Sequence, residues 1–201
     1  MRVIVATSNK GKLAEIRSTV DLPGIEFTTA GELGFDALDV EETGTTFLEN
    51  ARLKAQAYAE RFGMPSLADD SGLQVDALDG EPGVYSSRYA GVDGDDAANN
   101  RKLLAALSRT ADVDRTARFR SVVVLAYPTG AETIGEGVCE GVIGHVPRGD
   151  GGFGYDPLFM PLAAEGRTMA ELTLEEKNAI SHRGAALRAL REALSTREGH
   201  L

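Results

Sequence analysis

The first third of the chain alternates short apolar runs with segments of helical periodicity. The β-branched run 2–7 predicts a buried strand, and residues 25–28 predict a second one. Between them, a helix from about Lys10 is predicted by residues that recur at helical spacing: Leu13, Ile16, Arg17 and Val20. Thr46 and Glu49 form a capping-box pattern, and the helix expected after it has an apolar face made of Phe47, Ala51, Ala55, Tyr58 and Phe62.

The rest of the chain adds further elements of both kinds. The pattern predicts two short strands at 66–69 and 73–75, a helix at 95–108, and a hairpin of 118–127 with 132–144. A second capping box begins at Thr173, and a final helix carries the apolar residues Ala186, Leu187, Leu190 and Leu194. Helices that alternate with strands, together with a hairpin, predict an α/β fold with a mixed sheet.

Composition narrows the class of protein. A chain of 201 residues with 42% hydrophobic residues can bury a sizeable core in one domain, or in one core split by a cleft. No apolar run approaches the roughly 20 residues that span a bilayer, and the apolar stretch at the N-terminus is too short for a signal peptide. Cys139 is the only cysteine, which excludes an intramolecular disulfide framework and a cysteine-based metal site. We therefore expect a cytoplasmic protein.

The net charge of −10 constrains the partners. A nucleic-acid polymer or an anionic membrane surface requires a basic face, so neither is expected as the main partner. A small anionic substrate remains possible. Its phosphates would need a site that is locally basic or that carries a divalent cation.

The segment 7–12, TSNKGK, is a candidate phosphate site. It lies between a predicted strand and a predicted helix, where backbone N–H groups attract anions and the two lysines add positive charge. It does not match the Walker A pattern. The alternative is an ordinary strand-to-helix turn capped by Ser8 or Asn9.

Adjacent carboxylates at Asp69 and Asp70 follow a short apolar run. Two buried carboxylates cannot both stay ionised without a counter-charge. Mg²⁺ prefers a few oxygen ligands with room for water and substrate phosphates, and Asp70 with Glu41 would supply them. The alternatives are a turn in which Asp69 caps local N–H groups and a solvated Glu41 near a helix start. Lys54 shares a helix face with Asn50 and could reach a cleft or be solvated.

Two later segments carry aromatic and basic residues. Glycines at 149, 151, 152 and 154 lie around Phe153 and Tyr155, an arrangement that suits stacking on a flat base; a tight glycine turn with core aromatics is the alternative. Lys177, His182 and Arg183 fall near predicted helix starts, where the helix dipole disfavours a cation. They suggest contact with an anion or a carbonyl oxygen, although a solvated face would explain them too.

Taken in order, these motifs resemble those of the non-canonical purine nucleoside triphosphate pyrophosphatases, the inosine triphosphate pyrophosphatase family. The resemblance covers about residues 1–195 and rests on ATSNKGKLAEI, EETGTTFLENARLKA, ADDSGLQVDALDGEPGVYSSRYAG, GGFGYDPLF and EEKNAISHRGAAL. It implies one domain over 1–201, with a long mixed sheet and flanking helices that form two lobes around a cleft. It also implies a homodimer that hydrolyses ITP, dITP and XTP to the monophosphate and pyrophosphate with Mg²⁺, cleansing the nucleotide pool.

The resemblance also assigns residues to roles. Asp70 matches the proton acceptor and, with Glu41, the metal carboxylates, and Asp69 remains the alternative base. The substrate-binding positions fall on Thr7, Ser8, Asn9, Lys10, Gly11, Lys12, Ser71, Phe153, Gly154, Tyr155, Asp156, Lys177, His182 and Arg183. Lys54 matches a lysine that some members bring to the substrate. Two other functions stay open: a Mg²⁺-dependent pyrophosphatase for other modified nucleotides, such as pyrimidine triphosphates, and a nucleotide-binding module without catalysis.

Overall fold

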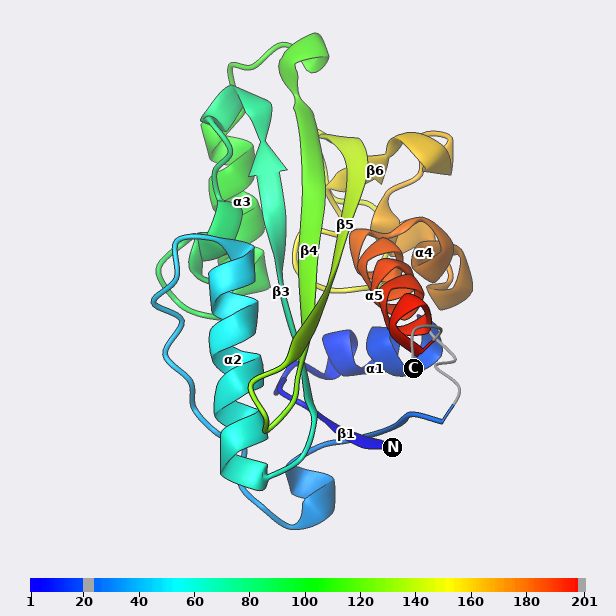
Figure 1. The fold of residues 1–201 in the computed structure, drawn as a ribbon. Helices are drawn as coiled ribbons and strands as arrows, with labels where there is room; N and C mark the ends of the chain where they lie inside the picture. Colours follow the sequence, from blue (N-terminus) through cyan, green and yellow to red (C-terminus); the bar gives the residue numbers. More distant parts are fainter. Residues whose placement is uncertain (20–23, 199–201) are drawn as a thin grey trace. The chain divides into compact units, whose positions relative to one another are not determined.

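The computed structural model describes residues 1–19 and 24–198 (Figure 1). The chain divides into two compact units. Unit 1 comprises 1–70, 121–137 and 183–201, and unit 2 comprises 71–120 and 138–182. The helices are α1 Lys10–Thr19, α2 Phe47–Phe62, α3 Asp96–Ala106, α4 Leu174–Ile180 and α5 His182–Glu198. The strands are β1 Arg2–Val5, β2 Glu26–Thr28, β3 Ser66–Val75, β4 Thr116–Ala126, β5 Glu132–Ile143 and β6 Phe159–Pro161.

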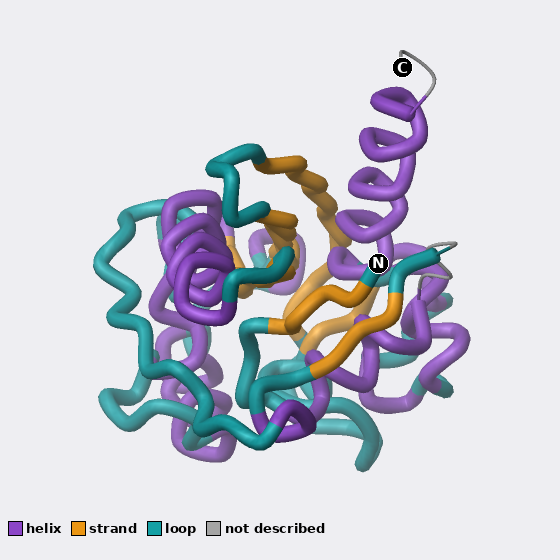
Figure 2. Tube along the Cα trace, turned by 60° about the horizontal axis from the view of Figure 1, so that its bottom comes forward, coloured by secondary structure: helices purple, strands orange, loops and turns teal. Residues whose placement is uncertain are grey.

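The strands form one six-stranded sheet in the order β2-β1-β3-β4-β5-β6. β1 pairs in parallel with β2 and β3, and β5 pairs antiparallel with β6, so the sheet is mixed. The parallel pair β1–β2 lies beside the N-terminus (Figure 2). β3, β4 and β5 each contribute residues to both units. The predicted α/β class with a mixed sheet is therefore confirmed.

Unit 1 has its own apolar core between strands and helices. β5 and α5 are close enough that a Cβ added at Gly135 would lie 2.1 Å from the Ala186 carbonyl oxygen, so a side chain there would displace the helix. α2 begins with the capping box predicted at Thr46 and Glu49. The core consists of Val3, Val5, Ile16, Leu67, Val123, Leu125, Ala186, Leu187 and Leu190.

Unit 2 has a separate core, in which aromatic residues take a larger part. The buried Arg115 donates hydrogen bonds to the carbonyls of Leu107, Ile143 and Gly144. The core consists of Leu73, Val75, Leu103, Leu107, Ala117, Phe119, Cys139, Ile143, Tyr155, Leu158, Phe159 and Met169.

The structure confirms most predicted elements and corrects one. The helix expected from Lys10 and both capping boxes are present, and Val20 lies outside the described residues. The prediction of separate strands at 66–69 and 73–75 was wrong, because β3 runs unbroken through both. Small residues in its middle do not interrupt a strand when the backbone is paired on either side. Among the described residues, no helix is long and apolar enough to cross a membrane.

Candidate active site

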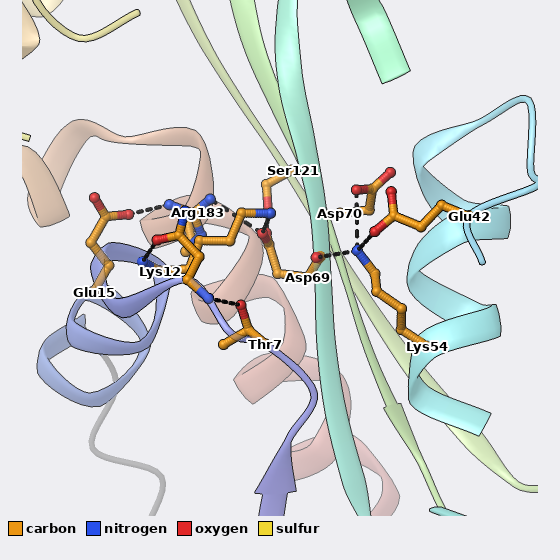
Figure 3. A network of polar contacts seen from close by, with 10 residues as sticks. Thr7, Lys12, Glu15, Glu42, Lys54, Asp69, Asp70, Ser121 and Arg183 are labelled. Atoms are coloured by element: carbon orange, nitrogen blue, oxygen red, sulfur yellow. Dashed lines mark hydrogen bonds and ion pairs between the residues drawn. The ribbon is translucent and has the colours of Figure 1, made fainter. Parts of the chain in front are cut away.

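Asp69 and Asp70 point to opposite sides of β3 (Figure 3). Successive side chains on a strand alternate between faces, so neighbouring carboxylates on an unbroken strand must separate. Each then has cations of its own. Lys12 and Arg183 pair with Asp69, and Lys54 pairs with Asp70. Lysine and arginine side chains therefore supply counter-charge on both faces.

Asp69 is buried. Its Oδ2 receives Lys12 Nζ at 2.8 Å and Arg183 Nη2 at 3.2 Å, and its Oδ1 accepts a hydrogen bond from Ser121 Oγ at 2.5 Å. Burial alone would raise the pKa of Asp69. The charges of Arg183 and Lys12, with hydrogen bonds from Lys12 and Ser121, outweigh burial and hold this pKa well below its usual range. Such a carboxylate is a poor proton acceptor.

Arg183 extends this arrangement to α1, where it forms an ion pair with Glu15. The charges alternate from Lys12 through Asp69 and Arg183 to Glu15, which lies three residues after Lys12 and so on nearly the same helix face. Lys12 has the most exposed side chain of the four, at 18%. We call these four residues the charge chain; its end at Lys12 presents an ammonium group at the predicted phosphate segment.

The segment Thr7–Lys12 is folded by its own side chains. Asn9 Oδ1 accepts the Lys12 N–H at 3.0 Å, and Thr7 Oγ1 accepts the Asn9 N–H at 3.2 Å. Ser8 and Lys10 are exposed, and the first turn of α1 carries no acidic residue. The helix N-terminus and Lys12 are therefore placed to attract an anion.

Asp70 has a contrasting environment. Lys54 Nζ lies 3.3 Å from Asp70 Oδ1, 2.7 Å from Glu42 Oε1 and 3.1 Å from the Asp69 carbonyl oxygen. Asp70 Oδ2 is buried and has no hydrogen-bond partner among the described residues. Burial raises the pKa of Asp70, and the charges of Glu42 and Asp69 add to this effect, although Lys54 and Lys12 oppose it. Asp70 is thus a stronger base than its neighbour.

Lys54 stays protonated in this setting. Burial would lower the pKa of Lys54, but the charges of Asp70, Glu42 and Asp69 and the hydrogen bond to Glu42 outweigh it and raise that pKa. The face shared by Lys54 and Asn50 is the inner one: Asn50 is completely buried and accepts the Gly44 N–H at 2.8 Å.

The structure places Glu42 on Lys54, whereas its neighbour Glu41 is exposed. The assignment of Glu41 as a metal ligand stays a prediction. Glu42 was missed at the sequence level, although it occupies the same EETG motif. Which of two adjacent acids turns inward depends on the backbone of the segment, which the motif does not reveal.

In unit 2, Asp156 fixes the backbone of the glycine-rich segment, residues 149–154. Its Oδ2 accepts the Phe153 N–H at 2.9 Å and forms an ion pair with the buried Lys177. Lys177 Nζ lies 4.7 Å from the centre of the Phe153 ring, a cation–π distance. A Cβ added at Gly152 would fall 2.0 Å from Asp156 Oδ2, so only glycine fits beside this carboxylate.

The other predicted residues of unit 2 are more enclosed. Tyr155 is buried in the core and donates its hydroxyl to the Ser86 carbonyl at 2.9 Å, which is the alternative foreseen for an aromatic residue in a glycine turn. His182 is also buried, and its ring stacks on Phe119 at 4.7 Å between centroids. Ser71 is half-buried on β3. Phe153 is therefore the predicted aromatic with accessible surface.

The units divide the predicted site residues. The boundary falls between Asp70 and Ser71 and between His182 and Arg183. Unit 1 brings together the segment Thr7–Lys12, Asp69, Asp70 and Arg183 through the contacts given above. Unit 2 brings together the glycine-rich segment and Lys177. Asp96 and Asn100 of α3 also contact that segment and were not predicted.

The sequence model of the Ham1 family matches residues 3–193. The chain belongs to this family. Among its relatives are the dITP/XTP pyrophosphatases of Geobacter sulfurreducens, 53% identical over 96% of both chains, and of Streptomyces coelicolor, 52% identical over 94% of both. Among solved structures, a HAM1 protein from Coxiella burnetii has a TM-score of 0.86 at 45% identity, covering 98% of this chain and 99% of the other. A nucleoside-triphosphatase / dITP/XTP pyrophosphatase from Mycobacterium abscessus has a TM-score of 0.75 at 46% identity, covering 94% and 98%.

Membership of the Ham1 family confirms the resemblance drawn from the motifs. It also raises the question whether the residues present suit a magnesium ion. No group of three or more histidine, cysteine or acidic side chains converges within the described residues. Mg²⁺ needs only one or two carboxylates, the rest of its shell being water and phosphate oxygens. The unpartnered Oδ2 of Asp70 is an oxygen donor of the right kind.

Proposed function

We propose that this Ham1 family protein hydrolyses the non-canonical purine nucleoside triphosphates ITP, dITP and XTP to the monophosphate and pyrophosphate. The names of its relatives, at about half identity over nearly the whole chain, support this reaction. The observation that carries it is the state of Asp70: a buried carboxylate with one oxygen on Lys54 and the other without a partner among the described residues. A module that only bound phosphate would have no use for such an acid.

The chain's own residues divide the work. Lys12 and the N-terminus of α1 would bind the phosphates. Asp70 would orient a water molecule and accept its proton as the water oxygen attacks the α-phosphorus; the bond between that phosphorus and the oxygen that bridges it to the β-phosphate breaks, and pyrophosphate leaves. Lys54, protonated and fixed by Glu42, would favour the ionised form of Asp70, which is the form that accepts the proton.

Magnesium belongs to this proposal as its cofactor. Asp70 and Glu41 would hold the ion. When bound, Mg²⁺ neutralises phosphate charge and orients the phosphate chain.

Selection of the base would rest on unit 2. Phe153 offers a flat ring for stacking, and Lys177 beside it is a donor. Hypoxanthine and xanthine carry an acceptor at position 6, where adenine carries an amino donor. A site built around donors can reject the analogue by roughly 10⁴ when polar groups are left unpaired. His182 and Arg183 remain predicted nucleotide contacts.

The proposal includes a homodimer and a cytoplasmic location. The single cysteine is consistent with a reducing compartment. Sedimentation velocity at several protein concentrations tests the dimer.

One assay tests the reaction. Purified protein is incubated with ITP, XTP, dUTP or ATP, with and without Mg²⁺, and pyrophosphate and orthophosphate are measured separately. We expect pyrophosphate as the direct product from ITP and XTP with Mg²⁺, and little turnover of ATP. Preference for dUTP would favour a pyrimidine pyrophosphatase. Binding of ITP without product would indicate a non-catalytic module, and direct release of orthophosphate would contradict the proposed bond cleavage.

A further inference from the structure

Two polar side chains of α3 contact the glycine-rich segment, which is predicted to bind the base. Asp96 Oδ2 accepts the Gly154 N–H at 2.7 Å, and Asn100 Nδ2 donates to the Gly154 carbonyl at 2.8 Å. Asp96 and Asn100 are four residues apart, so they project from one face of the helix. The backbone N–H and the backbone carbonyl of Gly154 therefore both form hydrogen bonds with side chains of α3.

Together with Asp156, this contact fixes the backbone on both sides of the Phe153 ring. Asp156 accepts the N–H of Phe153, and α3 holds the N–H and carbonyl of the next residue. Gly154 has a φ of +63°, in the left-handed region, so the chain turns sharply immediately after the aromatic residue. A ring whose two flanking peptides are fixed in this way has little freedom to tilt.

The two side chains have few other tasks. The Oδ1 of Asn100 is buried and has no hydrogen-bond partner among the described residues, so the bond to Gly154 is what engages this amide. Capping of α3 is done by the preceding residue: Asp95 accepts the Ala98 N–H at 2.9 Å. Asp96 therefore binds the glycine-rich segment and does not cap the helix. Its negative charge makes the hydrogen bond from the Gly154 N–H stronger than a neutral one.

We propose that Asp96 and Asn100 are positioning residues that set the Phe153 ring against the purine and thereby determine base selectivity. This inference rests on the proposed function, in which the glycine-rich segment receives the base. Stacking of a base on an aromatic side chain depends on the placement of the ring. Loosening Gly154 would weaken recognition of the base without changing any group in unit 1 that binds phosphate.

Two near-isosteric variants and a matched control test this. Asn100→Asp replaces the amide donor with a carboxylate oxygen facing the Gly154 carbonyl, and Asp96→Asn weakens the charged hydrogen bond. Asp95→Asn removes the same charge one residue earlier, while asparagine still caps a helix. For each protein, kcat and KM are measured with ITP and with ATP. Inhibition by inorganic tripolyphosphate, a competing ligand that lacks a base, is measured alongside. The Tm of each protein is also recorded.

We expect Asn100→Asp to raise KM for ITP about tenfold, because a neutral hydrogen bond is lost and a carboxylate oxygen then faces the Gly154 carbonyl. Asp96→Asn should have a smaller effect in the same direction. In both variants the ratio of kcat/KM for ITP over ATP should narrow, inhibition by tripolyphosphate should stay as in the wild type, and Asp95→Asn should match the wild type in each respect.

An unchanged ITP to ATP ratio in both variants would overturn the inference. Parallel loss of ITP turnover and tripolyphosphate inhibition would also overturn it, because the defect would then be general. Should the wild type itself fail to hydrolyse ITP, the proposed function falls first, which distinguishes the two failures.

Discussion

The two predicted halves of the site are stabilised in different ways. In unit 1, charged side chains from separate elements contact each other: the charge chain joins β3, α1 and α5 through Asp69, Lys12, Arg183 and Glu15. In unit 2, side chains contact backbone: Asp156, Asp96 and Asn100 all bind peptide groups of the glycine-rich segment. The first arrangement fixes the position of a charge, and the second fixes the position of a ring.

This difference corresponds to the two parts of the proposed substrate. A triphosphate is recognised by charge, which acts over several ångströms and needs an ammonium held in place. A purine is recognised by a flat face and by edge groups, which need close and exact placement of partners. Breaking the charge chain should therefore lower the stability of the fold, whereas loosening the glycine-rich segment should mainly change the selectivity for the base.

The largest effect is expected from Arg183→Met. Removal of the guanidinium leaves Glu15 and Asp69 as buried carboxylates with fewer counter-charges, which lowers the free energy of unfolding by about 3–5 kcal/mol. Urea unfolding followed by circular dichroism measures it. Arg17→Met is the matched control, because Arg17 on α1 pairs with Glu32 at the surface, where solvent screens the pair and it contributes little to stability. Equal losses in both variants would mean that the charge chain does not stabilise unit 1.

The next largest effect is expected from Asp70→Asn. The amide keeps the shape of the side chain but cannot accept the proton, so kcat for ITP should fall by about two orders of magnitude with KM little changed. Initial rates of pyrophosphate release measure the change, and Asp36→Asn at an exposed position of unit 1 serves as control. Near-normal turnover would remove Asp70 from the role of base and reopen the case for another group.

Much of the fold can be predicted from residues that lie close together in the sequence. The helices after Thr46 and Thr173 begin where the capping boxes predicted, because a cap satisfies local N–H groups whatever lies elsewhere in the chain. The interruption wrongly expected within β3 shows the limit of such reasoning. Ser71 and Gly72 are weak strand formers by themselves, yet pairing with neighbouring strands keeps the backbone extended.

The site was predictable where its residues form compact motifs. Asp69 and Asp70 could be recognised, but their separation onto two faces required knowing that the strand is unbroken. Arg183 and Glu15 lie 168 positions apart in the sequence, and nothing local pairs that arginine with one acid among many. Asp96 and Asn100 escaped notice because a hydrogen bond to a backbone group leaves no motif.

Within unit 2, two glycine variants separate contact from backbone strain. In Gly152→Ala the new methyl would fall against the Asp156 carboxylate, which must move away from Phe153 and Lys177. In Gly154→Ala nothing lies within 4 Å of the methyl, so the penalty is the left-handed φ alone, about 1 kcal/mol. We expect kcat/KM for ITP to fall about tenfold or more in Gly152→Ala and by less in Gly154→Ala. The reverse order would mean that Asp156 does not control the loop.

The smallest effect expected is a gain in stability, and its sign comes from the opposite pKa directions of the two neighbours on β3. For Asp69 the folded-state pKa is depressed, so its contribution is present above the unfolded pKa and is lost as the pH falls from there through the folded-state pKa. For Asp70 the folded-state pKa is raised, so ionisation above the unfolded pKa reduces stability.

Without added metal at pH 7, Asp70→Asn should therefore raise the free energy of unfolding by about 0.5 kcal/mol or more, as substitutions at destabilised active-site groups often do. Urea unfolding at pH 7 and pH 4 measures it. The gain should shrink at pH 4, where wild-type Asp70 is more protonated, and a loss at pH 7 would show that the pair with Lys54 outweighs the burial of Asp70.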